Sequence, residues 1–266
     1  MNLPDQPVIG LMFFAIGLAL VPVATHLVRR LVPEDRAFIA RWGFSHIVMV
    51  ILFGVAAMAS LSLIGPAEST IGLLVQTLFV LSVASLAAAK FANDCEPLGW
   101  RALGLPAGGD PKALMAAGIS FMFVLPVLLG ALILWPILLE WSGTEVEPQP
   151  VMQILLSMRG PDLIAGVLIA VVFQPFLEEV LFRGFLQPLL VQKLSNWGGV
   201  ITTSALFALI HGFTAFLPIF ILSMAIGGIM LRTRRLSAAW FLHALHNGTA
   251  LGINFMLENG RMVEGT

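Results

Sequence analysis

The sequence predicts an all-α fold, a polytopic membrane bundle of about eight transmembrane helices. Of its 266 residues, 58% are hydrophobic and only 11% are charged, whereas a soluble domain carries roughly 25% charged residues. The mean hydropathy is +0.95. The apolar residues also lie in long runs, and a helix needs about 20 of them to cross a hydrocarbon core about 30 Å thick.

The N-terminal half holds four apolar runs without Asp, Glu, Lys or Arg, and each predicts one transmembrane helix. The residues before the first run include Asp5 but no basic residue. A secretory signal has a positive n-region, so we interpret the first run as a permanent helix. The four predicted helices are 8–28, 42–64, 69–89 and 113–139.

The C-terminal half is more polar, and its apolar runs are less regular. The run 198–231 has 34 residues, too many for one untilted crossing. Gly212 and Pro218 lie where the run could break, so we predict two helices there. The C-terminal half therefore predicts four more helices, at about 163–186, 198–212, 214–231 and 237–257.

Lys and Arg are distributed in a way that supports eight crossings. Eleven of the 14 basic residues lie in four alternate loops, 29–41, 90–112, 187–197 and 232–236. Cytoplasmic loops are enriched in Lys and Arg. We therefore expect these loops in the cytoplasm, both termini outside, and a location in a bacterial or archaeal inner membrane.

Composition also excludes several kinds of site and partner. The single Cys95 excludes an internal disulfide framework, and no CxxC or Cys/His zinc spacing occurs. A net charge of −1 gives no reason to expect nucleic acid. The predicted partner is the lipid bilayer, and the short apolar piece 151–158 is expected to lie on its surface.

Polar side chains within the predicted spans concentrate in the last four helices. Each charge inside a bilayer costs at least about 2.5–3.5 kcal/mol, so such residues are functional candidates. Residues four apart share a helix face, so Glu179 and Arg183 can pair, leaving Glu178 without a local cation as a candidate general base. His243 and Asn247 share a face by the same rule. His211 lies on another helix, and His246 is expected to point away from the Asn247 face.

Three motifs made of these residues resemble a known family. They are EExxxR at Glu178–Arg183, FxxxH at Phe207–His211 and HxxxN at His243–Asn247. In this order they resemble the CPBP family of CAAX proteases and bacteriocin-processing enzymes, also called Abi. The motifs span about 178–247, and the N-terminal helices carry no diagnostic residue.

The resemblance implies an intramembrane glutamic-type endopeptidase that cleaves a peptide near the cytoplasmic side. Glu178 and His211 would activate a water, and His243 and Asn247 would form the oxyanion site. We expect one membrane domain over 1–266, with N-terminal helices in 1–140 and catalytic helices in 162–257. The residues expected to support the site are Glu179, Arg183 and Phe207.

Two other functions and one other mechanism remain open at this stage. The chain could be a non-catalytic immunity or scaffold member of the same fold, or a proton-coupled transporter that uses its carboxylates as a relay. We favour no cofactor; a zinc enzyme would use Glu178, His211 and His243 as ligands, since catalytic zinc often takes two His and one Glu. The substrate would be a peptide or protein, and nothing specifies a prenyl pocket.

Overall fold

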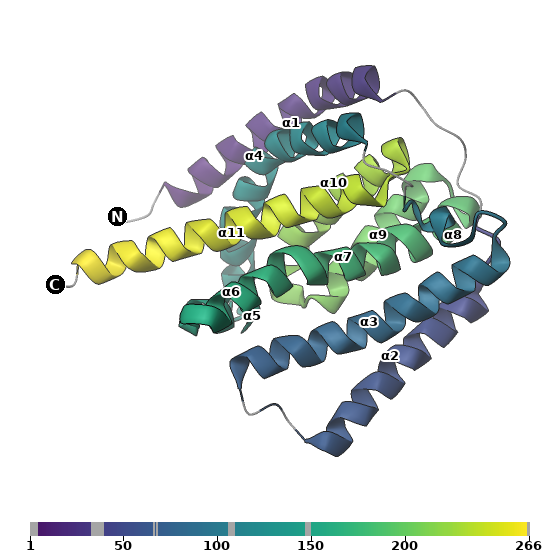
Figure 1. Cartoon of the computed structure of the whole chain (residues 1–266). Helices are drawn as coiled ribbons and strands as arrows, with labels where there is room; N and C mark the ends of the chain where they lie inside the picture. Colours follow the sequence, from purple (N-terminus) through teal and green to yellow (C-terminus); the bar gives the residue numbers. More distant parts are fainter. Residues whose placement is uncertain are drawn as a thin grey trace.

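The computed structural model describes residues 5–32, 40–65, 67, 69–105, 110–146 and 150–264, and all its regular elements are helices (Figure 1). The predicted all-α membrane bundle is confirmed. The elements are α1 Gln6–Leu31, α2 Phe44–Ile64, α3 Thr70–Cys95, η1 Gly99–Leu103, α4 Pro111–Trp141, α5 Pro150–Ser157, α6 Gly160–Leu168, η2 Ile169–Phe173, α7 Gln174–Glu179, η3 Val180–Leu186, α8 Gln187–Lys193, α9 Asn196–Ile210, η4 Phe213–Ala215, α10 Phe216–Thr233 and α11 Leu236–Glu264.

Within the described residues, six helices are long and apolar enough to cross a membrane: α1 to α4, the continuous helix Gly160–Lys193, and Phe213–Thr233. The chain is an integral membrane protein. Two further predicted spans are helices that do not meet the same measure. The helix α9 has 15 residues, about 22 Å at 1.5 Å per residue. In α11, polar His243, His246 and Asn247 lower the hydropathy of a 29-residue helix.

The first four helices form two pairs that flank the C-terminal helices (Figure 1). α1 lies along α4, and the buried side of α4 packs on α10 and α11. α2 lies along α3, which packs with η1, η3 and α7. The more polar C-terminal helices are therefore held between two apolar pairs.

The long helix Gly160–Lys193 is interrupted by two π-helical segments, which the sequence did not predict. Gln174 N donates to Ile169 O, and Gln187 N donates to Phe182 O, each five residues back. A proline follows each of these residues, Pro175 and Pro188. π-Bulges are frequent at functional sites, and the six residues of α7 between these two carry both glutamates.

The predicted break in the run 198–231 is confirmed. α9 ends at Ile210, and Gly212 has φ 94°, a left-handed conformation that suits glycine. Pro218 lies in the first turn of α10 and causes no break there, because the first residues of a helix have no intrahelical partner for their N–H groups.

The four basic loops meet at one end of the bundle. Arg232 Nε donates to Val32 O (2.9 Å), Arg41 N donates to Glu96 Oε1 (2.5 Å), and Leu236 N donates to Gly104 O (2.9 Å). Ala40 N donates to Gln192 Oε1 (3.3 Å). These contacts agree with the predicted grouping of the loops on one side, although part of 29–41 and of 90–112 lies outside the described residues.

Candidate active site

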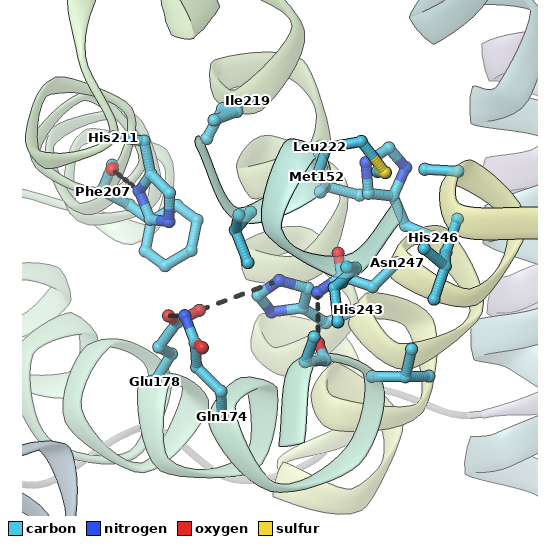
Figure 2. A pocket seen from close by; sticks show the side chains of 16 residues that line it. Met152, Gln174, Glu178, Phe207, His211, Ile219, Leu222, His243, His246 and Asn247 are labelled. Carbon is cyan, nitrogen blue, oxygen red and sulfur yellow. Dashed lines mark hydrogen bonds and ion pairs between the residues drawn. The ribbon is translucent and has the colours of Figure 1, made fainter. Parts of the chain in front are cut away.

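A cavity of about 130 Å³ lies among the C-terminal helices. One part of its wall is polar and the remainder is apolar. Figure 2 shows the polar side chains converging on this space from α7, the end of α9, and α11. All four predicted catalytic residues line the cavity: Glu178, His211, His243 and Asn247.

Glu178 is buried, with 7% of its surface exposed, and has two close polar neighbours. Gln174 Nε2 donates to its Oε1 at 2.9 Å from one turn earlier in the helix. His243 Nε2 lies 3.9 Å from its Oε2 (Figure 2), too far for a direct hydrogen bond. Oε1 of Glu178 is therefore hydrogen-bonded, whereas Oε2 faces the His243 imidazole without a direct hydrogen bond.

Glu179 forms the predicted pair with Arg183, and it also contacts a third helix. Its Oε2 lies 3.2 Å from Arg183 Nε, and both side chains are fully buried. His243 Nδ1 donates to Glu179 Oε1 at 2.7 Å. A carboxylate can only accept, so Nδ1 carries the proton and Nε2 faces Glu178. Arg183 is held further by Ser223, whose Oγ lies 2.7 Å from its NH2 group.

Asn247 is anchored by a backbone carbonyl that a proline leaves free. Its Nδ2 donates to Ala170 O at 2.9 Å. Gln174 N donates to Ile169 O, five residues back. The same spacing would pair the N–H of residue 175 with Ala170 O. Pro175 has no N–H to donate. The free carbonyl accepts from Asn247 instead, and the second Asn247 N–H remains for another acceptor.

His211 follows the last residue of α9, and its ring is exposed. Its Nδ1 donates to Phe207 O at 2.7 Å, which leaves Nε2 as the free nitrogen. Phe207 is buried, with its ring centroid 4.4 Å from that of His211 and 5.8 Å from that of His243. Arg183 Cζ lies 4.6 Å from the Phe207 centroid. Phe207 therefore separates His211 from the buried ion pair and fixes the imidazole by contact.

His246 lines the same cavity as His243 and Asn247, so the prediction that it points elsewhere is wrong. His246 lies three residues after His243, and residues three apart share a helix face. The prediction considered the position of His246 relative to the adjacent Asn247 only, and not its three-residue spacing from His243. The cavity-facing positions of α11 are 243, 246, 247, 250 and 251.

Sequence reasoning missed three other contributors to the site. Gln174 precedes Glu178 by four residues, and the spacing rule applied to Glu179 and Arg183 would have found it. Ser223 of α10 gave no signal. The helix α5 was expected on the bilayer surface, and its residues Val151, Met152 and Leu155 line the cavity. In Figure 1, α5 lies at the end of the bundle opposite α8.

Among the described residues, no group of three His, Cys, Asp or Glu side chains is arranged to hold a metal ion. His211 and His243 each have one ring nitrogen already bonded within the protein. Asn247, whose amide faces the cavity, is a hydrogen-bond donor rather than an anionic ligand.

Comparison with known proteins supports the family that the three motifs indicated. Residues 160–249 match the Type II CAAX prenyl endopeptidase Rce1-like family. The matched segment is a CAAX-protease-like segment. It runs from α6 into α11 and contains Gln174, Glu178, His211, His243 and Asn247. The family supports intramembrane peptide hydrolysis as the general activity. No curated protein and no solved structure is significantly similar to the chain.

Proposed function

We propose that the chain is an intramembrane endopeptidase in which Glu178 and His211 activate a water molecule. The observation that carries this proposal is the cavity wall shared by Glu178, His211, His243 and Asn247, on which Glu178 Oε2 lies 3.9 Å from His243 Nε2. A water oxygen about 2.8 Å from each atom fits that separation. General-base catalysis needs a base within hydrogen-bond reach of the water it deprotonates.

His243 and Asn247 form the oxyanion site in this mechanism. A protonated His243 would donate through Nε2, while Glu179 accepts from its Nδ1. With His243 protonated, the charges of Glu178, Glu179, Arg183 and His243 sum to zero, which offsets the cost of burying each one. Asn247 donates through the N–H that Ala170 O does not use. Donors fixed in advance in a site with little water stabilise a developing oxyanion most strongly.

The cleavage site is proposed to be reached from the side of the basic loops. His243 lies seven residues from the start of α11 at that end, about 10 Å along the helix. α5, which comes from the opposite end of the bundle, covers part of the cavity wall. A peptide would therefore approach along the face that α5 leaves open.

The proposal is tested by comparing peptide ends in membranes of cells that express the wild-type protein and Glu178→Gln. Ends produced by the enzyme should fall at least about 100-fold, because a general base contributes about 10²–10⁴-fold. Glu258→Gln is the matched control, since Glu258 is an exposed carboxylate on α11 that does not line the cavity. Identical peptide ends in wild-type and Glu178→Gln membranes would rule out Glu178 as the base.

We also propose that hydrolysis needs no metal ion. The support is geometric: among the described residues, no three His, Cys, Asp or Glu side chains are arranged to hold a metal ion. The test is elemental analysis of the purified active protein, with activity measured after exhaustive chelation. Activity should survive chelation. Stoichiometric zinc, with activity lost on removal and restored on return, would reassign Glu178, His211 and His243 as ligands.

A further inference from the structure

Gln174 lies one turn before Glu178, and both side chains line the cavity. Its Nε2 donates to Glu178 Oε1 at 2.9 Å (Figure 2). Gln174 is also the residue at which the first π-helical segment ends, because its N–H bonds to Ile169 O. The π-helical hydrogen bonding therefore ends at the residue whose side chain bonds to the Glu178 carboxylate.

The other groups around Glu178 do not hold it in place. Its neighbour Glu179 is occupied by Arg183 of η3 and by His243 of α11. His243 Nε2 faces Glu178 Oε2 at 3.9 Å. His211, which follows α9, and His246 and Asn247 of α11 line the cavity without a hydrogen bond to this carboxylate among the described contacts. On α3, which packs against α7, Ser85 donates instead to Leu177 O.

We propose that Gln174 is a positioning residue for Glu178. Its amide fixes Oε1 and stabilises the ionised carboxylate, because a hydrogen bond to the charged form favours that form. Oε2 is then left free to face His243 Nε2 and a water. The role assigned to Gln174 rests on the proposed function of Glu178 as base, but the bond itself can be tested without a substrate.

The chain offers a matched control in Gln187, at the end of the second π-helical segment. Gln187 is fully buried, and its Nε2 donates to Gly227 O at 3.0 Å. It does not line the cavity. If Gln174 served only to satisfy polar groups within the bundle, Gln174→Met and Gln187→Met would both lower stability, and neither would change how Glu178 titrates.

The experiment measures labelling of Glu178 by N,N′-dicyclohexylcarbodiimide, an apolar reagent that modifies protonated carboxyl groups, in the purified full chain across a pH series. Mass spectrometry follows the Glu178 peptide. The plateau rate at low pH reports access of the reagent, and the midpoint reports ionisation. Gln174→Met should keep the plateau and move the midpoint up by about one pH unit, so that labelling above the wild-type midpoint is about tenfold faster.

Gln187→Met should leave the midpoint at its wild-type value. An unchanged midpoint in Gln174→Met, or an equal shift in Gln187→Met, would overturn the positioning role. These outcomes are separate from the test of the function itself, because Glu178→Gln could still lose or keep cleavage in either case. Loss of cleavage in Glu178→Gln with no shift in Gln174→Met would leave the base in place and remove Gln174 from the mechanism.

Discussion

Glu178 and Glu179 are neighbours in the chain but contact different partners in the fold. Glu178 faces the cavity and bonds Gln174, whereas Glu179 joins Arg183 to His243 behind the wall. Because Glu179 holds His243 Nδ1, the other ring nitrogen faces Glu178. The two adjacent carboxylates therefore contact opposite nitrogens of one imidazole.

At the residue scale, helical spacing predicted contacts within a helix and could not predict contacts between helices. The Glu179–Arg183 pair is confirmed at 3.2 Å. The contact from Glu179 to His243 spans 64 positions, and it depends on how α7 and α11 pack. The same limit applies to Ser223, which reaches Arg183 across 40 positions. The sequence showed which residues are polar and which of them pair within one helix, but it did not show which of them pair between helices.

His246 supplies a prediction at this scale. It lines the cavity on the α11 face shared with His243 but forms no described bond to Glu178. We expect His246→Ala to raise KM by about threefold to tenfold with little change in kcat, the signature of binding that is equal in ground and transition states. The measurement uses a synthetic peptide that spans the cleavage site. That site is the one identified by comparing peptide ends in wild-type and Glu178→Gln membranes.

The matched control for this change is His26→Ala, because His26 is exposed on α1 and lies outside the cavity. It should leave both kinetic constants unchanged. A kcat that collapses in His246→Ala as it does in Glu178→Gln would mean that His246, rather than His243, acts on the reacting groups.

At the element scale, the long helix Gly160–Lys193 differs most from its predicted form. The sequence predicted one helix at 163–186, whereas the chain forms α6, a π segment, α7, a second π segment and α8. Hydropathy reports only that the run is apolar. It therefore predicts a transmembrane span, but not whether each backbone N–H bonds four or five residues back. The register depends on prolines and on distant donors such as Trp240, whose Nε1 donates to Val172 O at 2.9 Å.

Pro175 gives the prediction at this scale. Alanine at this position would supply an N–H to Ala170 O, in competition with the Asn247 side chain. We expect Pro175→Ala to lower kcat at least about tenfold, because Asn247 then loses its anchor and removing one oxyanion donor costs about 10²–10³-fold. Thermal stability should not fall, since proline in a helix interior costs about 3 kcal/mol.

Pro136→Ala is the control, because Pro136 lies inside α4 and does not line the cavity. Both variants are compared by melting temperature and by cleavage of the same peptide. Full activity in Pro175→Ala would show that Asn247 is held in place without the free carbonyl of Ala170.

At the scale of the whole molecule, the distribution of charge and the packing of the loops agree. Eleven of the 14 basic residues lie in four alternate loops, and those loops are joined by hydrogen bonds between residues far apart in sequence. Charge counting predicted the common side because Lys and Arg are costly to move across a bilayer. It carried no information on which loops touch.

The topology is tested with single-cysteine variants in a Cys95→Ala background. Lys193 and Arg101 are exposed at the basic end, and Glu140 is exposed at the far end of α4. A membrane-impermeant maleimide should label Glu140→Cys in intact cells, and Lys193→Cys and Arg101→Cys only after the membrane is opened. Eight crossings put both chain ends on the Glu140 side, and Figure 1 shows the start of α1 and the end of α11 at the same end of the bundle.

Labelling of Lys193→Cys from outside, with Glu140→Cys protected, would reverse the orientation and place the open face of the cavity toward the exterior. Labelling of Arg101→Cys and Lys193→Cys from opposite sides would contradict the bundle itself, because it requires their loops to meet.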